Sequence, residues 1–119
     1  MRELIEEIFL ISEQIRYVAV YYQQSLTTSS KDGIENASEA ESDKYEELMV
    51  YPAVLTLTRQ RGDIDCGGLN FLLIRYGNFY QYVAPITAGH LSVCIEPIPE
   101  ALDIALQIQE TARAYKDEG

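Results

Sequence analysis

The sequence lacks the residues that several kinds of functional site require. It has no tryptophan, one histidine and two cysteines, and its 9 basic residues face 19 acidic ones, for a net charge of −10. One histidine with two dispersed cysteines does not form a zinc site. A chain with this charge is repelled by nucleic-acid phosphates and anionic membrane surfaces. We therefore expect no metal, no cofactor and no nucleic-acid partner.

Segments that direct a chain across or into a membrane are not recognisable either. No basic segment is followed by an apolar run and a small-residue cleavage site, so we expect a cytoplasmic protein. No apolar run approaches the ~18–20 residues that cross a bilayer, so membrane insertion is not expected. Cys66 and Cys94 are predicted to be reduced, buried thiols, because two cysteines do not make a disulfide framework in a chain of this size.

The composition is that of a folded globular domain. Hydrophobic residues make up 47% and charged residues 24% of the 119 residues, far from the composition of disordered chains. A chain of this length fits one core, so we predict a single domain over residues 1–119. Most of the negative charge lies in residues 1–50. This bias is typical of solvated helix faces and a charged loop, or of a surface that meets a basic partner.

Helical periodicity is clearest at the two ends of the chain. The spacing over residues 2–15 predicts an amphipathic helix with Leu4, Ile8, Ile11 and Ile15 on its apolar side. A last helix is expected to begin at Pro99, which suits the first helical position. Its apolar face comprises Ala101, Ile104, Ala105, Ile108, Ala112 and Tyr115.

Between these helices the sequence alternates as expected for strands separated by turns. The predicted strands are residues 17–22, 26–30, 69–76, 79–86 and 90–96. The first two form a hairpin whose second strand is weak and is expected at or near an edge of the sheet. The last three form an antiparallel meander with tight turns at Gly77-Asn78 and at residues 87–89. Residues 31–41 have no periodicity and are predicted to be a flexible acidic loop.

The segment after that loop is ambiguous because it contains Pro52. Ser42 and Asp43 are possible N-caps, so a helix is expected to begin near them. Its apolar stripe comprises Tyr45, Leu48, Met49, Pro52 and Leu55. Proline inside a helix costs on the order of 3 kcal/mol, and residues 53–58 could instead form a strand. We favour a kinked or two-piece helix that ends near Arg61-Gly62, because basic residues followed by glycine are typical of a helix C-terminus.

These elements predict an α+β fold in the order α-β-β-α-β-β-β-α, with helices packed on a five-stranded antiparallel sheet. The order, the length and residues 72–77, 83–86 and 89–93 resemble the roadblock family and the related profilin-like folds. The roadblock family includes the dynein light chain of that name and bacterial regulators of Ras-like small GTPases. The resemblance covers about residues 3 to 115, and the family has no short invariant motif.

The resemblance implies a non-enzymatic scaffold or regulator that binds a partner protein, in particular a Ras-like small GTPase. It also implies a homodimer, or a heterodimer with a paralogue, formed by joining the sheets and pairing the central helices. The expected protein interface, on exposed faces of the second helix, comprises Tyr45, Glu46, Glu47, Met49, Tyr51, Val54 and Arg59. A small acidic dimeric chaperone of an exported protein is the alternative. Such a chaperone is not expected to combine an early hairpin with a late three-stranded meander.

No catalytic residues are predicted, but one cluster has the residue types that chemistry uses. Residues 59–68 combine two arginines, two aspartates, Cys66 and three glycines. Their arrangement is typical of a helix end followed by a turn, and the aspartates beside Cys66 oppose formation of a thiolate. A nucleophilic Cys66 or Cys94 paired with His90 is a third hypothesis. His90 is more simply interpreted as the start of a strand with a half-exposed ring.

Overall fold

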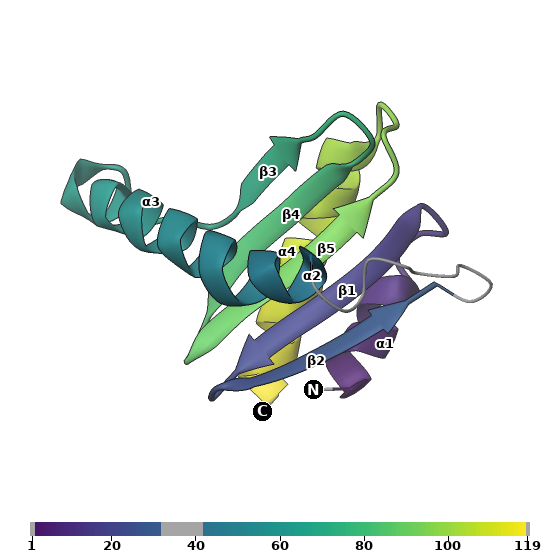
Figure 1. Cartoon of the computed structure of the whole chain (residues 1–119), viewed down its shortest axis with the longest axis horizontal. Coiled ribbons are helices and arrows are strands. Elements are labelled where there is room, and N and C mark those ends of the chain that lie inside the picture. Colours follow the sequence, from purple (N-terminus) through teal and green to yellow (C-terminus); the bar gives the residue numbers. More distant parts are fainter. Residues whose placement is uncertain (1, 32–41, 119) are drawn as a thin grey trace.

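The computed structural model describes residues 2–31 and 42–118, which form a five-stranded antiparallel sheet with helices on both faces (Figure 1). The strands are β1 (Ile15–Tyr22), β2 (Ser25–Ser30), β3 (Leu72–Arg75), β4 (Tyr80–Ile86) and β5 (Gly89–Ile95). Their order across the sheet is β2-β1-β5-β4-β3. The predicted hairpin and meander are therefore both confirmed, and β1 joins them by pairing with β5.

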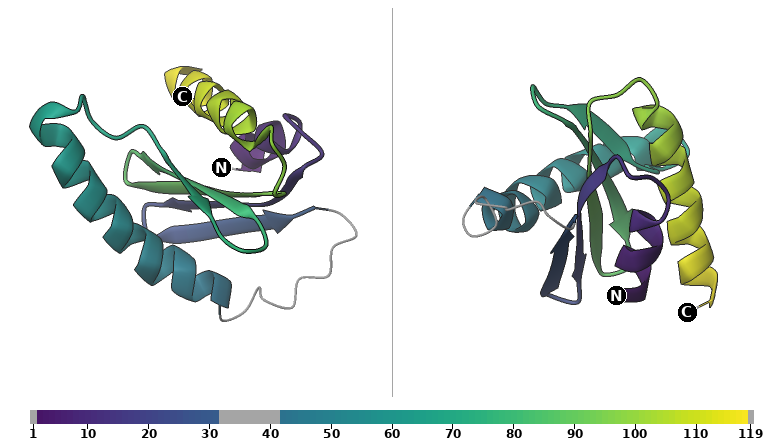
Figure 2. Two further views of the ribbon diagram at one scale, coloured as in Figure 1. Left: turned by 90° about the horizontal axis from the view of Figure 1, so that it is seen from above. Right: turned by 90° about the vertical axis from the view of Figure 1, so that its right-hand side faces the viewer.

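The helices form two outer layers. They are α1 (Arg2–Phe9), α2 (Ser42–Tyr45), the π-helical turn η2 (Glu46–Val50), α3 (Tyr51–Asp65) and α4 (Ala101–Glu118). Figure 2 shows α1 and α4 on one face of the sheet and the run α2–η2–α3 on the other. This arrangement confirms the predicted α+β fold and its element order. Within the described residues no helix is both long and apolar enough to span a membrane.

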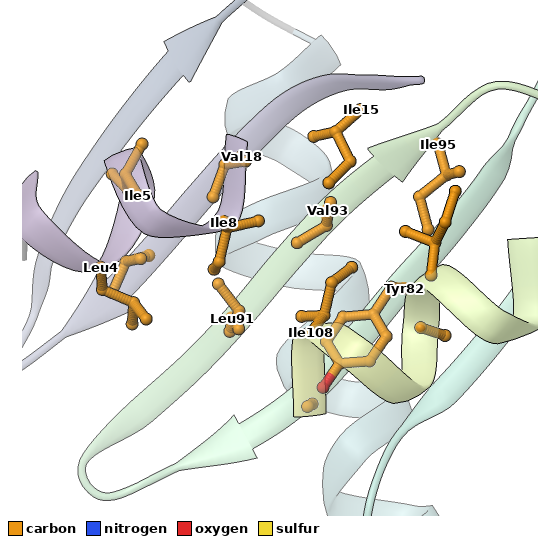
Figure 3. Close-up of a cluster of buried hydrophobic side chains, with 14 of the residues drawn as sticks. Leu4, Ile5, Ile8, Ile15, Val18, Tyr82, Leu91, Val93, Ile95 and Ile108 are labelled. Atoms are coloured by element: carbon orange, nitrogen blue, oxygen red, sulfur yellow. The ribbon is translucent and has the colours of Figure 1, made fainter. Parts of the chain in front are cut away.

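The larger hydrophobic core lies between the sheet and the α1–α4 layer (Figure 3). Strands β1 and β5 contribute side chains that are fully buried there, namely Ile15, Val18, Val20, Leu91, Val93 and Ile95. Those of β5, and Val18 and Val20 of β1, alternate because successive side chains point to opposite faces of a sheet. An irregularity in the pairing between Ile15 and Tyr17 separates Ile15 from this alternation. The apolar face predicted for the last helix is confirmed, since Ala101, Ile104, Ala105 and Ile108 are buried in this core. Ala112 and Tyr115 pack against it.

The two edge strands of the sheet are the ones with the fewest apolar or the fewest paired residues. The Ser- and Thr-rich β2 forms one edge, as predicted, and the four-residue β3 forms the other. Gly89 begins β5 beside β1, and a Cβ there would lie 1.6 Å from the Tyr21 carbonyl oxygen. Only glycine fits this close approach of two backbones.

The first helix is shorter than predicted. It ends at Phe9, and Ile15, which the helical spacing placed in the helix, begins β1 and pairs with Ile95. The Ser12 hydroxyl accepts a hydrogen bond from the Gln14 amide at 3.0 Å in the intervening turn. A serine hydroxyl bonded to the backbone two residues on favours a turn over a continuing helix.

One strand and the last helix are also shorter than predicted. The strand expected over residues 69–76 is confined to Leu72–Arg75, because only these residues pair with β4. The last helix begins at Ala101, two residues after Pro99. The loop predicted over residues 31–41 lies outside the described residues except for Lys31, whose ammonium group donates a hydrogen bond to the Glu13 carbonyl at 2.6 Å.

Candidate protein-interaction surface

The second helix is built in two pieces joined by a π-helical turn. In η2 the Tyr51 amide donates to the Glu46 carbonyl, so the turn holds one more residue than an α-helical turn. Pro52 follows at once, among the first residues of α3, where its missing N–H is tolerated. The prediction of a two-piece helix is confirmed, and the alternative of a strand over residues 53–58 is wrong.

This helix ends at Asp65, slightly later than predicted. The Gly62 carbonyl accepts hydrogen bonds from the amides of Cys66 and Gly68, both at 3.1 Å. Gly67 and Gly68 have positive φ angles of 80° and 87°, which glycine adopts at little cost. The chain thus reverses at Gly67, and Gly62 is buried inside α3 because the returning backbone passes close to it.

One side of η2 and α3 faces the sheet. The buried stripe is Glu47, Tyr51, Leu55 and Gly62, which recur at helical spacing. The stripe predicted from the sequence is wrong in part, because Tyr45, Leu48 and Met49 are exposed. Tyr51 and Leu55 instead pack with Val83 of the sheet.

A buried acid–histidine pair fixes the helix to the sheet. The Glu47 carboxylate lies 2.8 Å from Nε2 of His90 on β5, and both side chains are only 2% exposed. The His90 ring stacks against Tyr21 at a centroid distance of 5.6 Å and meets Tyr51 edge-on at 6.3 Å. The expectation of a half-exposed His90 ring is therefore wrong.

Tyr51 adds a second polar link in the same place. Its hydroxyl donates a hydrogen bond to the Glu46 carboxylate at 2.7 Å. Burial, assisted by this carboxylate, raises the pKa of the Tyr51 hydroxyl far above its usual range. The tyrosine therefore stays neutral and keeps its hydroxyl available as a donor.

The opposite side of α3 carries the exposed apolar residues Leu57 and Ile64. We call this side the outer seam and define it as Val50, Ala53, Leu57, Gln60 and Ile64. Leu57 is 70% and Ile64 76% exposed, whereas Val50, at the end of η2, is partly buried and packs against the cluster of Tyr51, Leu55 and Val83. These positions alternate at intervals of three and four residues, as in the contact seam of paired helices. In Figure 1 the C-terminal half of α3 extends beyond the sheet.

The seven residues predicted for the interface have three different placements. Glu47 and Tyr51 are buried within the chain. Glu46 and Val54 are partly buried, and Tyr45, Met49 and Arg59 are exposed. The exposed apolar residues Leu57 and Ile64 are not among the seven. The spacing of Val50, Leu57 and Ile64 at seven-residue intervals was the signal that could have identified them.

The cysteine hypothesis finds no matching geometry. Cys66 is exposed beyond α3, where Arg61 Nη1 lies 3.2 Å from its sulfur and 2.6 Å from the Asp65 carboxylate. His90 pairs with Glu47 near the other end of the helix, roughly 25–30 Å away at 1.5 Å per residue. Cys94 is buried on the same strand as His90 but roughly 13 Å along it. The described residues contain no group of three potential metal ligands.

Comparison with known proteins supports the fold. The structure is similar to the crystal structure of a Roadblock/LC7 domain from Streptomyces avermitilis, with a TM-score of 0.66 and 10% sequence identity. The similarity covers 97% of this chain and 96% of that one. No protein-family model matches the sequence, and no curated protein matches it. The fold of this chain is therefore roadblock-like, as the sequence predicted.

Proposed function

We propose that this chain is a non-enzymatic, dimeric scaffold or regulator that binds a partner protein, in particular a Ras-like small GTPase. The observation that carries the proposal is the exposed outer seam on a helix that extends beyond its own sheet. Exposed leucine and isoleucine aligned on one helix face are typical of an interaction surface. The roadblock-like fold adds support, because the resemblance noted in the sequence implies a protein-binding role.

The outer seam suits a second copy of the same helix. Its spacing of three and four residues lets side chains of one helix fit between those of another. The neighbouring β3 has four residues and only β4 beside it in the described chain, so its free backbone groups can pair with a second strand. Together these features support a homodimer, or a heterodimer with a paralogue.

The partner protein is expected at the start of the helix, beside the dimer contact. Tyr45 and Met49 are 60% and 61% exposed and lie one helical turn apart. Glu46 stands between them, and the N-terminal half of the chain carries most of the negative charge. This combination fits a partner that presents an apolar patch next to basic residues.

The chaperone alternative receives less support. The sheet has the early hairpin, β1 and β2, and the late meander of β3, β4 and β5. That order is the one not expected of a secretion chaperone. The same order supports the scaffold hypothesis.

The dimer is tested by placing charges in the outer seam. Light scattering of the parent at about 100 μM should return twice the chain mass of 13.5 kDa. Leu57→Asp with Ile64→Asp should return the chain mass, because burying two carboxylates in an apolar contact is unfavourable. Leu102→Asp is the matched control, since Leu102 is 54% exposed on α4. A monomeric parent, or a control that dissociates the dimer while the seam variant does not, would contradict the proposal.

The partner is tested separately with a purified Ras-like GTPase loaded with GDP or a GTP analogue. Tyr45→Ala with Met49→Ala should weaken binding at least tenfold while the chain remains dimeric, because exposed aromatic anchors often dominate interfaces. Asp103→Lys with Glu110→Lys on α4 serves as the control and should leave binding unchanged. Loss of binding in the control pair alone would place the partner on α4 instead.

A further inference from the structure

A pocket lies on the other face of the sheet from the outer seam. Its volume is about 770 Å³, and it opens between the C-terminal half of α4 and strands β4 and β5. Apolar side chains make up most of its lining, including Leu4, Ala84, Leu91 and Ala112. Pockets of roughly 300–1,000 Å³ with apolar walls and a few polar groups are typical of sites for small molecules.

Tyr82 supplies a polar group without a partner in this pocket. Its ring stacks on Phe71 at 5.1 Å between centroids, and the residue is only 1% exposed. In Figure 3 its hydroxyl points away from Ile95. No hydrogen bond joins this hydroxyl to any side chain that the structure describes, and only burial and Arg113 act on its pKa. Tyr82 lines the pocket, so its hydroxyl can donate a hydrogen bond to an acceptor bound there.

The charge of the pocket lining favours a ligand with a negative charge. Arg113 is its one charged residue among those described, although the chain as a whole carries −10. Arg113 makes only a long contact with Glu110, at 3.8 Å, and both side chains are more than half exposed. Its charge also acts on the Tyr82 hydroxyl, opposing the rise in pKa that burial causes. The net negative charge elsewhere is screened beyond about 8 Å at physiological salt.

We propose that this pocket binds a small amphipathic carboxylate, such as a medium-chain fatty acid. The alkyl chain would lie against Leu91, Ala84 and Ala112, and the carboxylate would accept hydrogen bonds from Arg113 and from the Tyr82 hydroxyl. A guanidinium group and a hydroxyl group both donate to a carboxylate. The site is independent of the proposed dimer, because α4, which lines the pocket, and α3 lie on opposite faces of the sheet (Figure 2).

Calorimetric titration with decanoate tests the proposal on the full chain. Decanol and decyltrimethylammonium share its alkyl chain and replace the carboxylate with a neutral or a cationic group. Decanoate should bind at least tenfold more tightly than decyltrimethylammonium. Chemical-shift changes should appear at Tyr82, Leu91 and Ala112 and be absent at His90. No binding of decanoate, or equal binding of the cation, would overturn the proposal.

Three variants separate the head-group contacts from the apolar walls. Arg113→Gln and Tyr82→Phe should each weaken decanoate about tenfold, the loss expected for a hydrogen bond to a charged group. Binding of decanol should be unchanged by Arg113→Gln. Ala112→Phe fills the pocket and should weaken both ligands. Arg59→Gln, on α3, is the matched control and should leave the binding of both ligands unchanged. If Arg113→Gln and Tyr82→Phe bind decanoate as tightly as the parent, the proposal is also overturned.

Discussion

The two faces of the sheet use different chemistry to hold their helices. Beneath α1 and α4 the buried side chains of β1 and β5 are aliphatic, as Val18, Val20, Leu91 and Val93 illustrate. On the other face β5 presents His90 and Ser92. His90 pairs with Glu47 of η2, and Ser92 pairs with Gln81 of β4. Apolar packing stabilises the α1–α4 layer without selecting specific pairs of side chains. The α3 layer is positioned by polar partners whose hydrogen bonds form in only one arrangement.

This difference explains how the exposed side of α3 is oriented. Glu47 is held by His90, and Tyr51 and Leu55 pack with Val83, so one side of the helix is committed to the sheet. Leu57 and Ile64 consequently face solvent. The contacts on the polar face of the sheet thus orient α3 so that its outer seam points to solvent, while the apolar face contributes most of the core. Four measurements test this division.

The largest loss is expected on the apolar face. Ile108→Ala removes a completely buried side chain from α4 and should lower the free energy of unfolding by about 3–4 kcal/mol. Urea unfolding followed by circular dichroism measures it. Leu106→Ala, at a position 46% exposed on the same helix, is the control and should cost less than about 1 kcal/mol. Equal losses would show that this layer is not the main core.

On the polar face, the Glu47–His90 pair should show coupling. Glu47→Ala and His90→Ala should each cost about 2–3 kcal/mol, because each leaves the other side chain buried without its partner. The double variant should cost at least about 1 kcal/mol less than the sum. Glu13→Ala, at an exposed position, should combine additively with His90→Ala. A fully additive Glu47–His90 cycle would mean that the contact does not position α3.

High pH probes one tyrosine on each face. The pKa values of Tyr51 and Tyr82 are both raised from the ordinary 10.0, chiefly by burial. Above pH 10 the unfolded chain loses protons that the folded chain keeps, so the free energy of unfolding falls as pH rises. The slope should reach about 1.4 kcal/mol per pH unit for each tyrosine. Phenylalanine at either position should reduce the slope, whereas Tyr45→Phe, at an exposed position, should not.

The smallest effect concerns a second buried polar pair. Gln81 Nε2 donates to the Ser92 hydroxyl at 2.5 Å on the α3 face. Ser92→Ala alone should cost about 1–2 kcal/mol, because the buried amide loses its acceptor. Adding Gln81→Met should recover most of this loss, since replacing both partners by apolar groups can be nearly neutral. If the double variant is less stable than Ser92→Ala, the two side chains stabilise the fold by more than satisfying each other's hydrogen-bonding groups, and the prediction is wrong.

Sequence periodicity by itself determined most of the sheet and the apolar face of α4. Alternation at period two identified β4 and β5, and the apolar stripe at Ala101, Ile104, Ala105 and Ile108 matched the buried face of α4. Both patterns repeat within a few residues, so they are visible locally. The weak, polar β2 was likewise assigned correctly to an edge.

Only the tertiary structure decided how the second helix is rotated, and with it the candidate surface. Glu47, Tyr51 and Leu55 face the sheet across the π-helical turn, whereas the stripe counted from Tyr45 shares only Leu55 with the buried residues. The burial of Glu47 depends on His90, which lies 43 residues away. The pocket beside Tyr82 similarly combines residues from both ends of the chain. Local spacing carries no information about partners so distant in sequence, because their contact exists only after the sheet has formed.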